Sequence, residues 1–101
     1  MTKLKYKISR EALFDLNDIW QYTFHKWSQN QADRYYNLIF EEIEFISKNS
    51  HLGISYAHIR KNYRASKVKS HLIFYRTNDD GIIEVIRVLH QRMDLKNKLK
   101  Q

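Results

Sequence analysis

Apolar residues recur along the chain with two different periods, and the change of period divides the sequence into a helical first half and a strand-rich second half. Between residues 10 and 48 apolar side chains return every three or four positions, which is typical of amphipathic helices. From residue 59 onward the period is close to two, which indicates strands. The predicted order is strand, helix, helix, strand, strand, strand.

The first predicted elements are a short strand and a helix. Apolar and charged residues alternate over Leu4–Ile8, as in a strand with one buried face. Ser9 is a suitable N-cap for the helix that follows, and Glu11 lies in its first turn near the positive end of the helix. We expect this helix to end near Lys26. Its apolar stripe consists of Ala12, Leu13, Leu16, Ile19, Trp20 and Thr23.

A second helix begins after Ser28. Ser28 and Gln31 have the spacing of a capping box, in which each residue bonds the backbone N–H of the other. The helix is expected to run to about Lys48 and to lie antiparallel to the first, because only two or three residues join them. Residues 49–58 are expected to form a loop. The apolar stripe consists of Ala32, Tyr35, Tyr36, Ile39, Ile43 and Ile46.

Turn residues separate the predicted strands of the second half. Asn78–Gly81 predicts a hairpin turn, since Gly81 can take a positive φ, and a shorter connection is expected near Ser66. Residues 93–101 are expected to form a short or frayed helix. The three strands are predicted at Ile59–Ala65, Lys69–Arg76 and Ile82–Leu89.

These elements predict an α+β fold. The helix pair restores the direction of the chain, and the first strand is expected beside the last. The result would be an antiparallel four-stranded sheet packed by an N-terminal helical hairpin. At 101 residues, of which 43% are hydrophobic, residues 1–101 are expected to be a single packed domain.

Charge is distributed unevenly. Residues 1–50 hold seven Lys or Arg and seven Asp or Glu, whereas residues 51–101 hold eleven and four, which accounts for the whole net charge of +7. Such asymmetry favours a polyanionic or acidic partner over a merely solubilising excess. The absence of cysteine excludes disulfides and fits a reducing compartment. No apolar segment follows Met1–Lys7, so we expect no secretory signal, and no apolar run is long enough to span a membrane.

Arginines of the second half are the main candidates for binding. Arg60 and Arg64 would share one face of the predicted strand Ile59–Ala65, with Arg76 and Arg87 in the neighbouring strands. Guanidinium groups suit phosphate or carboxylate. The alternative is a solvated sheet face with scattered ion pairs.

Two histidines need separate interpretations. His90, at the end of the last strand, is either a hydrogen-bonded strand terminator near Asp94, a contact to a target, or a proton carrier. His71 alternates with Ile73 and Tyr75 and is more typical of a packing residue. Neither has a third ligand at metal spacing, so no metal or other cofactor is expected.

The element order and several motifs together resemble the RelE/ParE toxin superfamily, and its ParE branch in particular. The resemblance extends from about Tyr6 to Asp94, although the proline that many members carry after the second helix is missing. The motifs that carry it are Ala12, Asp15-Leu16, Ile19 and Tyr22; Trp27, Gln31-Ala32 and Tyr35; Ser70 to Arg76; and Arg87-Val88-Leu89-His90-Gln91-Arg92-Met93-Asp94.

The resemblance implies a cytoplasmic toxin of a type II toxin–antitoxin system, silenced by a cognate antitoxin in a heteromeric complex. ParE-like members inhibit DNA gyrase by binding, whereas RelE-like members cut mRNA on the ribosome. The latter usually end in a tyrosine after the last strand. Here the last tyrosine is Tyr75 and Gln91 follows His90, which favours the non-enzymatic gyrase inhibitor. A degenerate, inert member is a third possibility.

Candidate contacts follow from this interpretation. An acidic antitoxin segment is expected to fold along the helical hairpin and against the sheet edge. The alternative is that the aromatic residues of the hairpin only pack in and around the core of this protein. The residues predicted to bind the antitoxin are Trp20, Phe24, Tyr36 and Phe40. The residues predicted to bind the target are Arg60, Arg64, Arg87, His90 and Arg92. In a nuclease, His90, Arg64, Arg87 and Arg92 would be catalytic.

Overall fold

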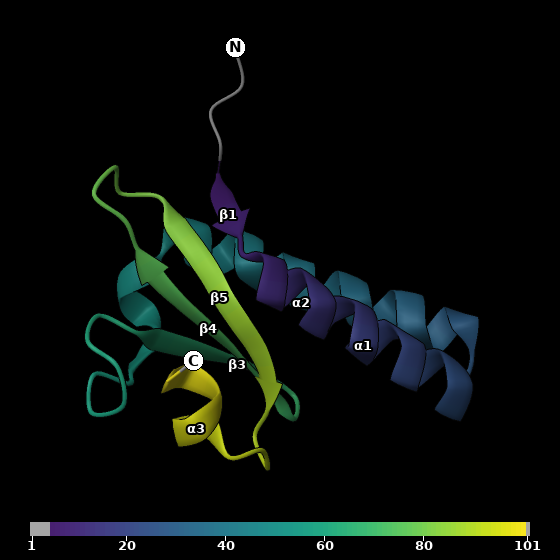
Figure 1. Ribbon diagram of the computed structural model, residues 1–101. Coiled ribbons are helices and arrows are strands. Elements are labelled where there is room, and N and C mark those ends of the chain that lie inside the picture. The colour runs from purple at the N-terminus through teal and green to yellow at the C-terminus, as the bar shows by residue number, and fades with distance from the viewer. Residues whose placement is uncertain (1–4, 101) are drawn as a thin grey trace.

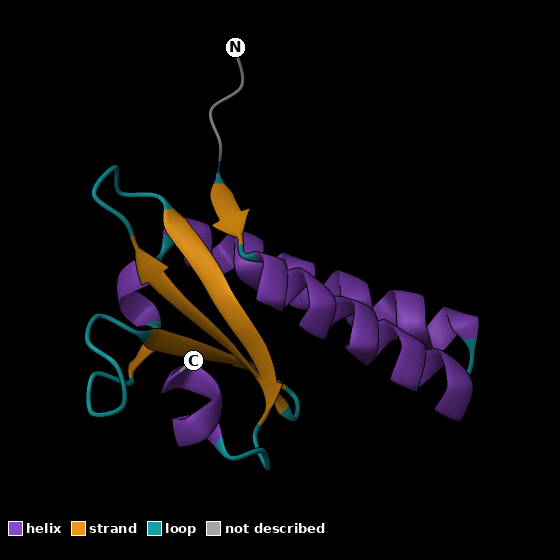
Figure 2. Cartoon of the chain, viewed as in Figure 1, coloured by secondary structure: helices purple, strands orange, loops and turns teal. Residues whose placement is uncertain are grey.

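The computed structural model describes residues 5–100, in which helices lie on both faces of one mixed sheet (Figures 1 and 2). None of these helices is long and apolar enough to cross a membrane. Along the chain the elements are β1 (Tyr6–Ile8), α1 (Arg10–Lys26), α2 (Gln29–Lys48), a 3₁₀ turn (Ser50–Leu52), β2 (Ile54–Ser55), β3 (Arg64–Val68), β4 (His71–Thr77), β5 (Ile83–His90) and α3 (Leu95–Lys100). The strand order is β1-β5-β4-β3-β2.

Both helices of the hairpin begin and end where the sequence predicts. The Ser9 hydroxyl oxygen accepts the N–H of Ala12 at 3.0 Å, and that of Ser28 accepts the N–H of Gln31 at 3.1 Å. Each bond satisfies one of the donors that the first turn of a helix leaves free. The α+β class and the helical hairpin are therefore confirmed, while the predicted strand at Leu4–Ile8 is seen from Tyr6 and Leu4 lies outside the described residues.

The prediction of an antiparallel sheet of four strands is wrong in two respects. β1 does lie beside β5, but the two run parallel, with Tyr6 opposite Ile83 and Ile8 opposite Val85. Two successive hairpins make β5 run in the direction of β3, and the long connection through α1 and α2 gives β1 the same direction. The fifth strand, β2, forms inside the predicted loop 49–58 and pairs with β3.

The predicted strand Ile59–Ala65 is wrong over residues 59–63, since β3 begins only at Arg64. Residues 56–63 close into a loop in which the Tyr56 N–H donates to the Tyr63 carbonyl at 2.8 Å and the Arg60 N–H donates to the Tyr56 carbonyl at 3.0 Å. Asn62, with φ of 69°, takes the left-handed conformation, which asparagine tolerates better than most residues. These local bonds replace strand pairing, so the alternating apolar residues pack from a loop.

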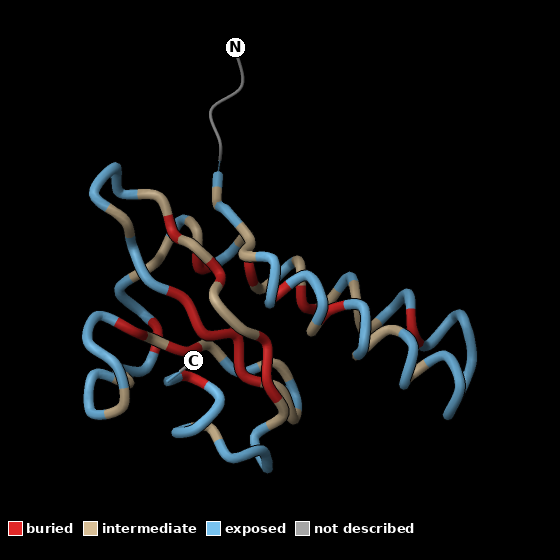
Figure 3. The backbone as a smooth tube through the Cα atoms, in the orientation of Figure 1, coloured by how far each residue is buried: buried red, intermediate tan, exposed pale blue. Residues whose placement is uncertain are grey.

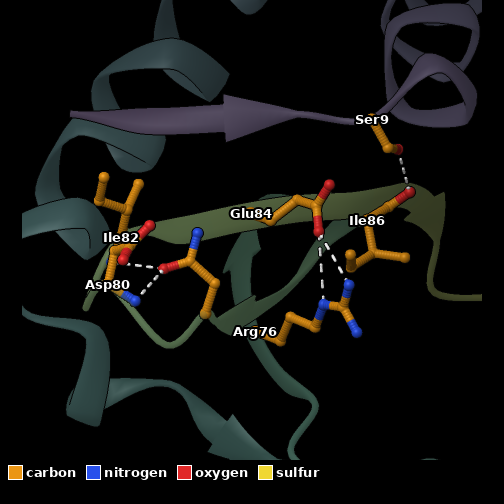
Figure 4. A network of polar contacts seen from close by, with 7 residues as sticks. Ser9, Arg76, Asp80, Ile82, Glu84 and Ile86 are labelled. Atoms are coloured by element: carbon orange, nitrogen blue, oxygen red, sulfur yellow. Dashed lines mark hydrogen bonds and ion pairs between the residues drawn. The ribbon is translucent and has the colours of Figure 1, made fainter. Parts of the chain in front are cut away.

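The hairpin between β3 and β4 turns later than predicted. Val68 still pairs with His71, which leaves Lys69 and Ser70 as the turn, with Lys69 at a φ of 52°. Ser66 lies inside β3, opposite Ile73. The other predicted turn is confirmed: Gly81 has a φ of 80°, and the side-chain oxygen of Asn78 accepts N–H groups across the turn (Figure 4).

The sheet is buried on both faces (Figure 3). On one face, the helical hairpin covers a core built from Ala12, Leu16, Ile39, Ile43, Ile46, Ile73, Tyr75, Ile83, Val85 and Val88. On the other face, α3 and the loop 56–63 cover a smaller core built from Tyr63, Ala65, Leu72, Phe74, Leu89 and Leu99. The C-terminal helix is thus held by the buried Leu99.

The edge of β5 that β1 leaves open is completed by side chains. β1 pairs only with Ile83 to Val85, so the backbone groups beyond Val85 have no strand partner on that side. The Ser9 hydroxyl donates to the Ile86 carbonyl at 2.7 Å (Figure 4), and the Asp15 carboxylate accepts the Val88 N–H at 3.0 Å. These two bonds fix the start of α1 against β5.

Candidate functional site

A groove of about 1050 Å³ lies between the outer part of the helical hairpin and the end of β5. In Figure 1 the tip of the helical hairpin extends beyond the sheet, so the outer turns of α1 and α2 have no strand beneath them. The side chains that give the groove its chemistry are Asp15, Tyr22, Lys26, Trp27, Tyr35, His71, His90 and Arg92.

Asp15, which lines this groove, forms an ion pair with Arg87 on β5. The carboxylate accepts from Nε of Arg87 at 2.7 Å and from its terminal nitrogen at 2.9 Å, and the two side chains are only 12% and 18% exposed. The hydrogen bonds that Arg87 donates to Asp15 raise the pKa of Arg87. The guanidinium of Arg87 is therefore bound to Asp15 of α1. This favours a role in holding the helix to the sheet over a role in contacting a target.

A phenol and two imidazoles meet at the centre of the groove. The Tyr35 hydroxyl donates to the Val68 carbonyl at 3.0 Å and lies 2.6 Å from Nδ1 of His71, which leaves Nδ1–H of His71 as the donor to the phenol oxygen. The rings of His71 and His90 meet edge to face, 5.2 Å apart. Burial raises the pKa of Tyr35, which keeps the phenol protonated at neutral pH.

His90 ends β5 with a local hydrogen bond. Its Nδ1 accepts the backbone N–H of Arg92 at 3.1 Å, so the proton of the neutral ring is on Nε2. This is the geometry of the strand-terminator interpretation. The same ring lines the groove together with the exposed Arg92, so a contact role is compatible with it.

The mouth of the groove combines exposed aromatic rings with a cation. Tyr22 and Trp27 are 63% and 68% exposed, and Met93 beside them is 44% exposed. Nζ of Lys26 lies 5.4 Å from the centre of the Tyr22 ring and 5.9 Å from that of Trp27. Such a surface can stack on planar groups and attract anions.

The predicted target-binding residues do not form one cluster. Arg87, His90 and Arg92 lie at the end of β5, whereas Arg60 and Arg64 lie elsewhere. Arg60 lies in the loop 56–63 and not on a strand face with Arg64. Its guanidinium donates to the Leu99 carbonyl at 3.1 Å. Arg64 begins β3 and donates to the Gly53 carbonyl at 2.8 Å.

The four aromatic residues proposed for the antitoxin are partly covered. Trp20 donates to Asp33 across the helical hairpin at 2.9 Å and stacks on Phe24, whose exposed fraction is 38%. Tyr36 and Phe40 contact each other and pack against the larger core. Each therefore has both a packing role and accessible surface.

Sequence patterns missed Asp15, Tyr35 and Lys26 as groove residues. Tyr35 appears in the apolar stripe of α2, and nothing local shows that its hydroxyl reaches β3 and β4. The detectable signal is on α1, where Asp15, Asp18, Tyr22 and Lys26 repeat at helical spacing beside the apolar stripe. No group of three potential metal ligands occurs within residues 5–100.

Acidification is expected to destabilise the protein through His71. Burial and then the nearby His90 lower its pKa from 6.5 to about 4, with Asp15 acting in the opposite direction. Between these pH values the unfolded chain binds a proton that the folded protein does not, so the free energy of unfolding falls as the pH falls from 6.5 to 4. Urea unfolding at pH 7, 6, 5 and ~4 measures this slope.

The matched control is the exposed His51. His71→Gln should flatten the slope, whereas His51→Gln should leave it in place. An NMR titration in which His71 of the folded protein gains its proton near pH 6.5 would contradict the prediction.

Comparison with known proteins identifies the class. Residues 6–95 match the family described as ParE toxin of type II toxin-antitoxin system, parDE. The chain is 37% identical over 95 residues to Toxin ParE1 of Mycobacterium tuberculosis, covering 94% of this chain and 97% of that protein. It is 38% identical over 95 residues to Toxin ParE1 of Caulobacter vibrioides, covering 93% and 96%.

A solved structure shares the fold. The chromosomal ParDE TA system from P. aeruginosa superposes with a TM-score of 0.74 at 16% sequence identity, covering 84% of this chain and 92% of that one. A helical hairpin over a mixed sheet, together with these matches, defines a toxin of the RelE/ParE superfamily. The chain belongs to the ParE toxin family of type II toxin–antitoxin systems.

Proposed function

We propose that this protein inhibits DNA gyrase by binding it, in the cytoplasm, on a complex that contains cleaved DNA. The observation that carries the proposal is the family match over residues 6–95, since gyrase inhibition is what resemblance to the ParE branch implies. The one-sided positive charge of residues 51–101 supports it, because a gyrase–DNA complex is a polyanion.

The groove is the proposed contact surface. Arg92 and Lys26 are exposed and take part in no ion pair among residues 5–100, so both charges are available to a target. His90 lines the same groove at the end of β5, while Arg87 acts indirectly by fixing α1. No step in this mechanism makes or breaks a covalent bond in the toxin.

The decisive experiment incubates the purified toxin with gyrase, ATP and supercoiled plasmid. After detergent and protease treatment, toxin-dependent linear DNA is expected. A parallel reaction with ribosomes and mRNA should leave the mRNA intact. Cut mRNA with untouched plasmid would overturn the proposal, and silence in both reactions would indicate an inert member.

One observation favours mRNA cleavage as a second candidate. The structure brings the phenol of Tyr35 to His71, and the ring of His71 to that of His90, in the groove that Arg92 lines, which the C-terminal sequence alone does not show. Cleavage through a 2′-hydroxyl needs a proton acceptor, a proton donor and a cation, and this set holds all three. Because the phenol and the His71 ring already bond each other, it ranks second.

An acidic antitoxin segment is the proposed occupant of the helical hairpin. Trp20 and Phe24 on α1, with Tyr36 and Phe40 on α2, offer partly exposed aromatic surface. An amphipathic segment that folds on this surface would bury its apolar side there. The net charge of +7 supports an acidic partner.

Phe24→Glu is expected to weaken antitoxin binding at least about tenfold, because a carboxylate would replace an aromatic contact of the proposed interface. Isothermal titration with the cognate antitoxin measures the affinity. Phe45→Glu is the matched control, since Phe45 is 49% exposed but lies in the last turns of α2. Equal affinity of Phe24→Glu and the wild type would remove this surface from the proposal.

A further inference from the structure

A second, smaller hollow lies at the opposite end of β4 from the groove. Its volume is about 330 Å³, and it forms where β2, the loop 56–63 and the ends of β3 and β4 meet. The residues that line it are Ser55, Ala57, Lys61, Asn62, Tyr63, Arg64, Tyr75, Arg76 and Thr77. Three of them are cations and none is a carboxylate.

The cations of this hollow are held in different ways. Arg64 is half-buried and anchored by its bond to the Gly53 carbonyl, so its guanidinium has a fixed position. Arg76 pairs with Glu84 at 3.1 Å (Figure 4) at the rim, where its side chain is 50% exposed. Lys61 is exposed and enters no ion pair among residues 5–100. Positive charge therefore exceeds negative charge here.

Neutral donors accompany these charges. Ser55 and Thr77 are among the lining residues, and the Ser55 hydroxyl oxygen accepts the Ala57 N–H at 3.3 Å, which leaves its proton for a ligand. The N–H groups of Lys61 and Asn62 take part in none of the backbone hydrogen bonds found in the described loops. A phosphate group has several acceptor oxygens, and such a set of donors can satisfy them.

We propose that this hollow binds a backbone phosphate of nucleic acid. The proposal deepens the proposed function and rests on it for the source of the ligand, because the DNA held by gyrase would supply the phosphate. An antitoxin carboxylate is less suited, because the aromatic surface proposed for the antitoxin lies on the helical hairpin and not at this hollow.

The first test is an NMR titration of the full-length toxin with a 20-base-pair duplex and, separately, with inorganic phosphate, at equal ionic strength. Both ligands should shift the amide signals of Lys61, Asn62 and Arg64, with the duplex acting at far lower concentration. Equal potency of inorganic phosphate would assign the hollow to a small free anion and overturn the proposal. Shifts with a Glu-rich peptide but not with phosphate would assign it to the antitoxin.

The second test is the salt dependence of duplex binding, followed by fluorescence anisotropy. One lost phosphate contact reduces the slope of log K against log salt by about 0.9, which is about eightfold in affinity at ~0.1 M salt. Lys61→Gln should show this reduction. Lys67→Gln is the matched control, since Lys67 is exposed on β3 outside the hollow. Equal effects of the two variants would indicate diffuse attraction and overturn the proposal.

These tests contain no gyrase, so their outcome is separate from that of the plasmid assay. If the toxin produces linear plasmid but the hollow binds no phosphate, only the proposal for the hollow is rejected. Phosphate binding without linear plasmid would remove gyrase as the target and leave the hollow as a nucleic-acid contact.

Discussion

Gly53→Ala is expected to lower the free energy of unfolding by about 3 kcal/mol, at the upper end of overpacking effects. A Cβ atom built on Gly53 would lie 2.0 Å from the Tyr75 hydroxyl oxygen and 2.8 Å from its Cζ. Tyr75 is fully buried and donates to the Ser50 carbonyl at 2.7 Å, so its ring cannot move aside without breaking that bond. Urea unfolding at neutral pH measures the change.

Steric contact, not backbone freedom, is the reason for this effect. Gly53 has φ of −65° and ψ of 152°, which any residue adopts. Gly81 is the matched control: it has a φ of 80° and no neighbour within 4 Å, so Gly81→Ala should cost only about 1 kcal/mol through the left-handed conformation. If Gly53→Ala costs no more than Gly81→Ala, the predicted clash does not exist.

A double-mutant cycle with Tyr75→Phe sharpens the test. Removing the hydroxyl deletes the atom nearest to the new Cβ, while the ring carbons at 2.8 and 2.9 Å remain. Gly53→Ala should therefore cost less in the Tyr75→Phe background, with a coupling of about 1 kcal/mol or more. If the stability losses of Gly53→Ala and Tyr75→Phe are strictly additive, the loss caused by the alanine does not come from contact with the Tyr75 hydroxyl.

Periodicity and capping residues were enough to predict the helical hairpin. Ser9 and Ser28 act locally, through bonds to N–H groups three residues away, and the apolar stripes repeat over several turns. The Asn78–Gly81 turn was predictable for the same reason, because its geometry depends on adjacent residues. Caps and turns of this kind depend only on residues that are close together in the sequence.

The parts that could not be predicted depend on distant partners. Ile59 and Tyr63 alternate as in a strand, but they pack against the smaller core from a loop whose bonds close between Tyr56 and Tyr63. β2 is two residues long and exists only because β3 lies beside it. No pattern within residues 49–63 distinguishes these outcomes.

The candidate sites show the same division. Arg92 and His90 were predictable as polar residues at a strand end, of which Arg92 is exposed and His90 is half-buried. The ion pair between Arg87 and Asp15 joins residues 72 positions apart, and the Tyr35–His71 hydrogen bond joins residues 36 positions apart. Arg60 and Arg64 are separated because Arg60 turns to the carbonyl of Leu99. Sequence therefore identifies the charged residues, and tertiary contacts decide which remain free to bind a partner.

Asp15→Ala is expected to lower the free energy of unfolding by about 2–3 kcal/mol. Removing one partner of a buried ion pair leaves the other charge unpaired, which costs about 3–5 kcal/mol in a fully buried pair. We expect a smaller loss here because the pair is not fully buried: the side chains of Asp15 and Arg87 are 12% and 18% exposed. The change also removes the acceptor of the Val88 N–H at the open edge of β5.

The matched control is Asp18, which is exposed on the same helix and enters no ion pair among residues 5–100. Asp18→Ala should change stability by less than about 0.5 kcal/mol, as surface substitutions do. In a double-mutant cycle, Asp15→Ala should cost much less when Arg87 is already methionine, because no charge is then left unpaired. The loss in the Asp15→Ala single variant should persist in 1 M NaCl, since screening acts weakly on a pair with little solvent access. Equal stabilities of the Asp15→Ala and Asp18→Ala variants would mean that the ion pair does not hold α1 to the sheet, and Arg87 would then be free to contact the target.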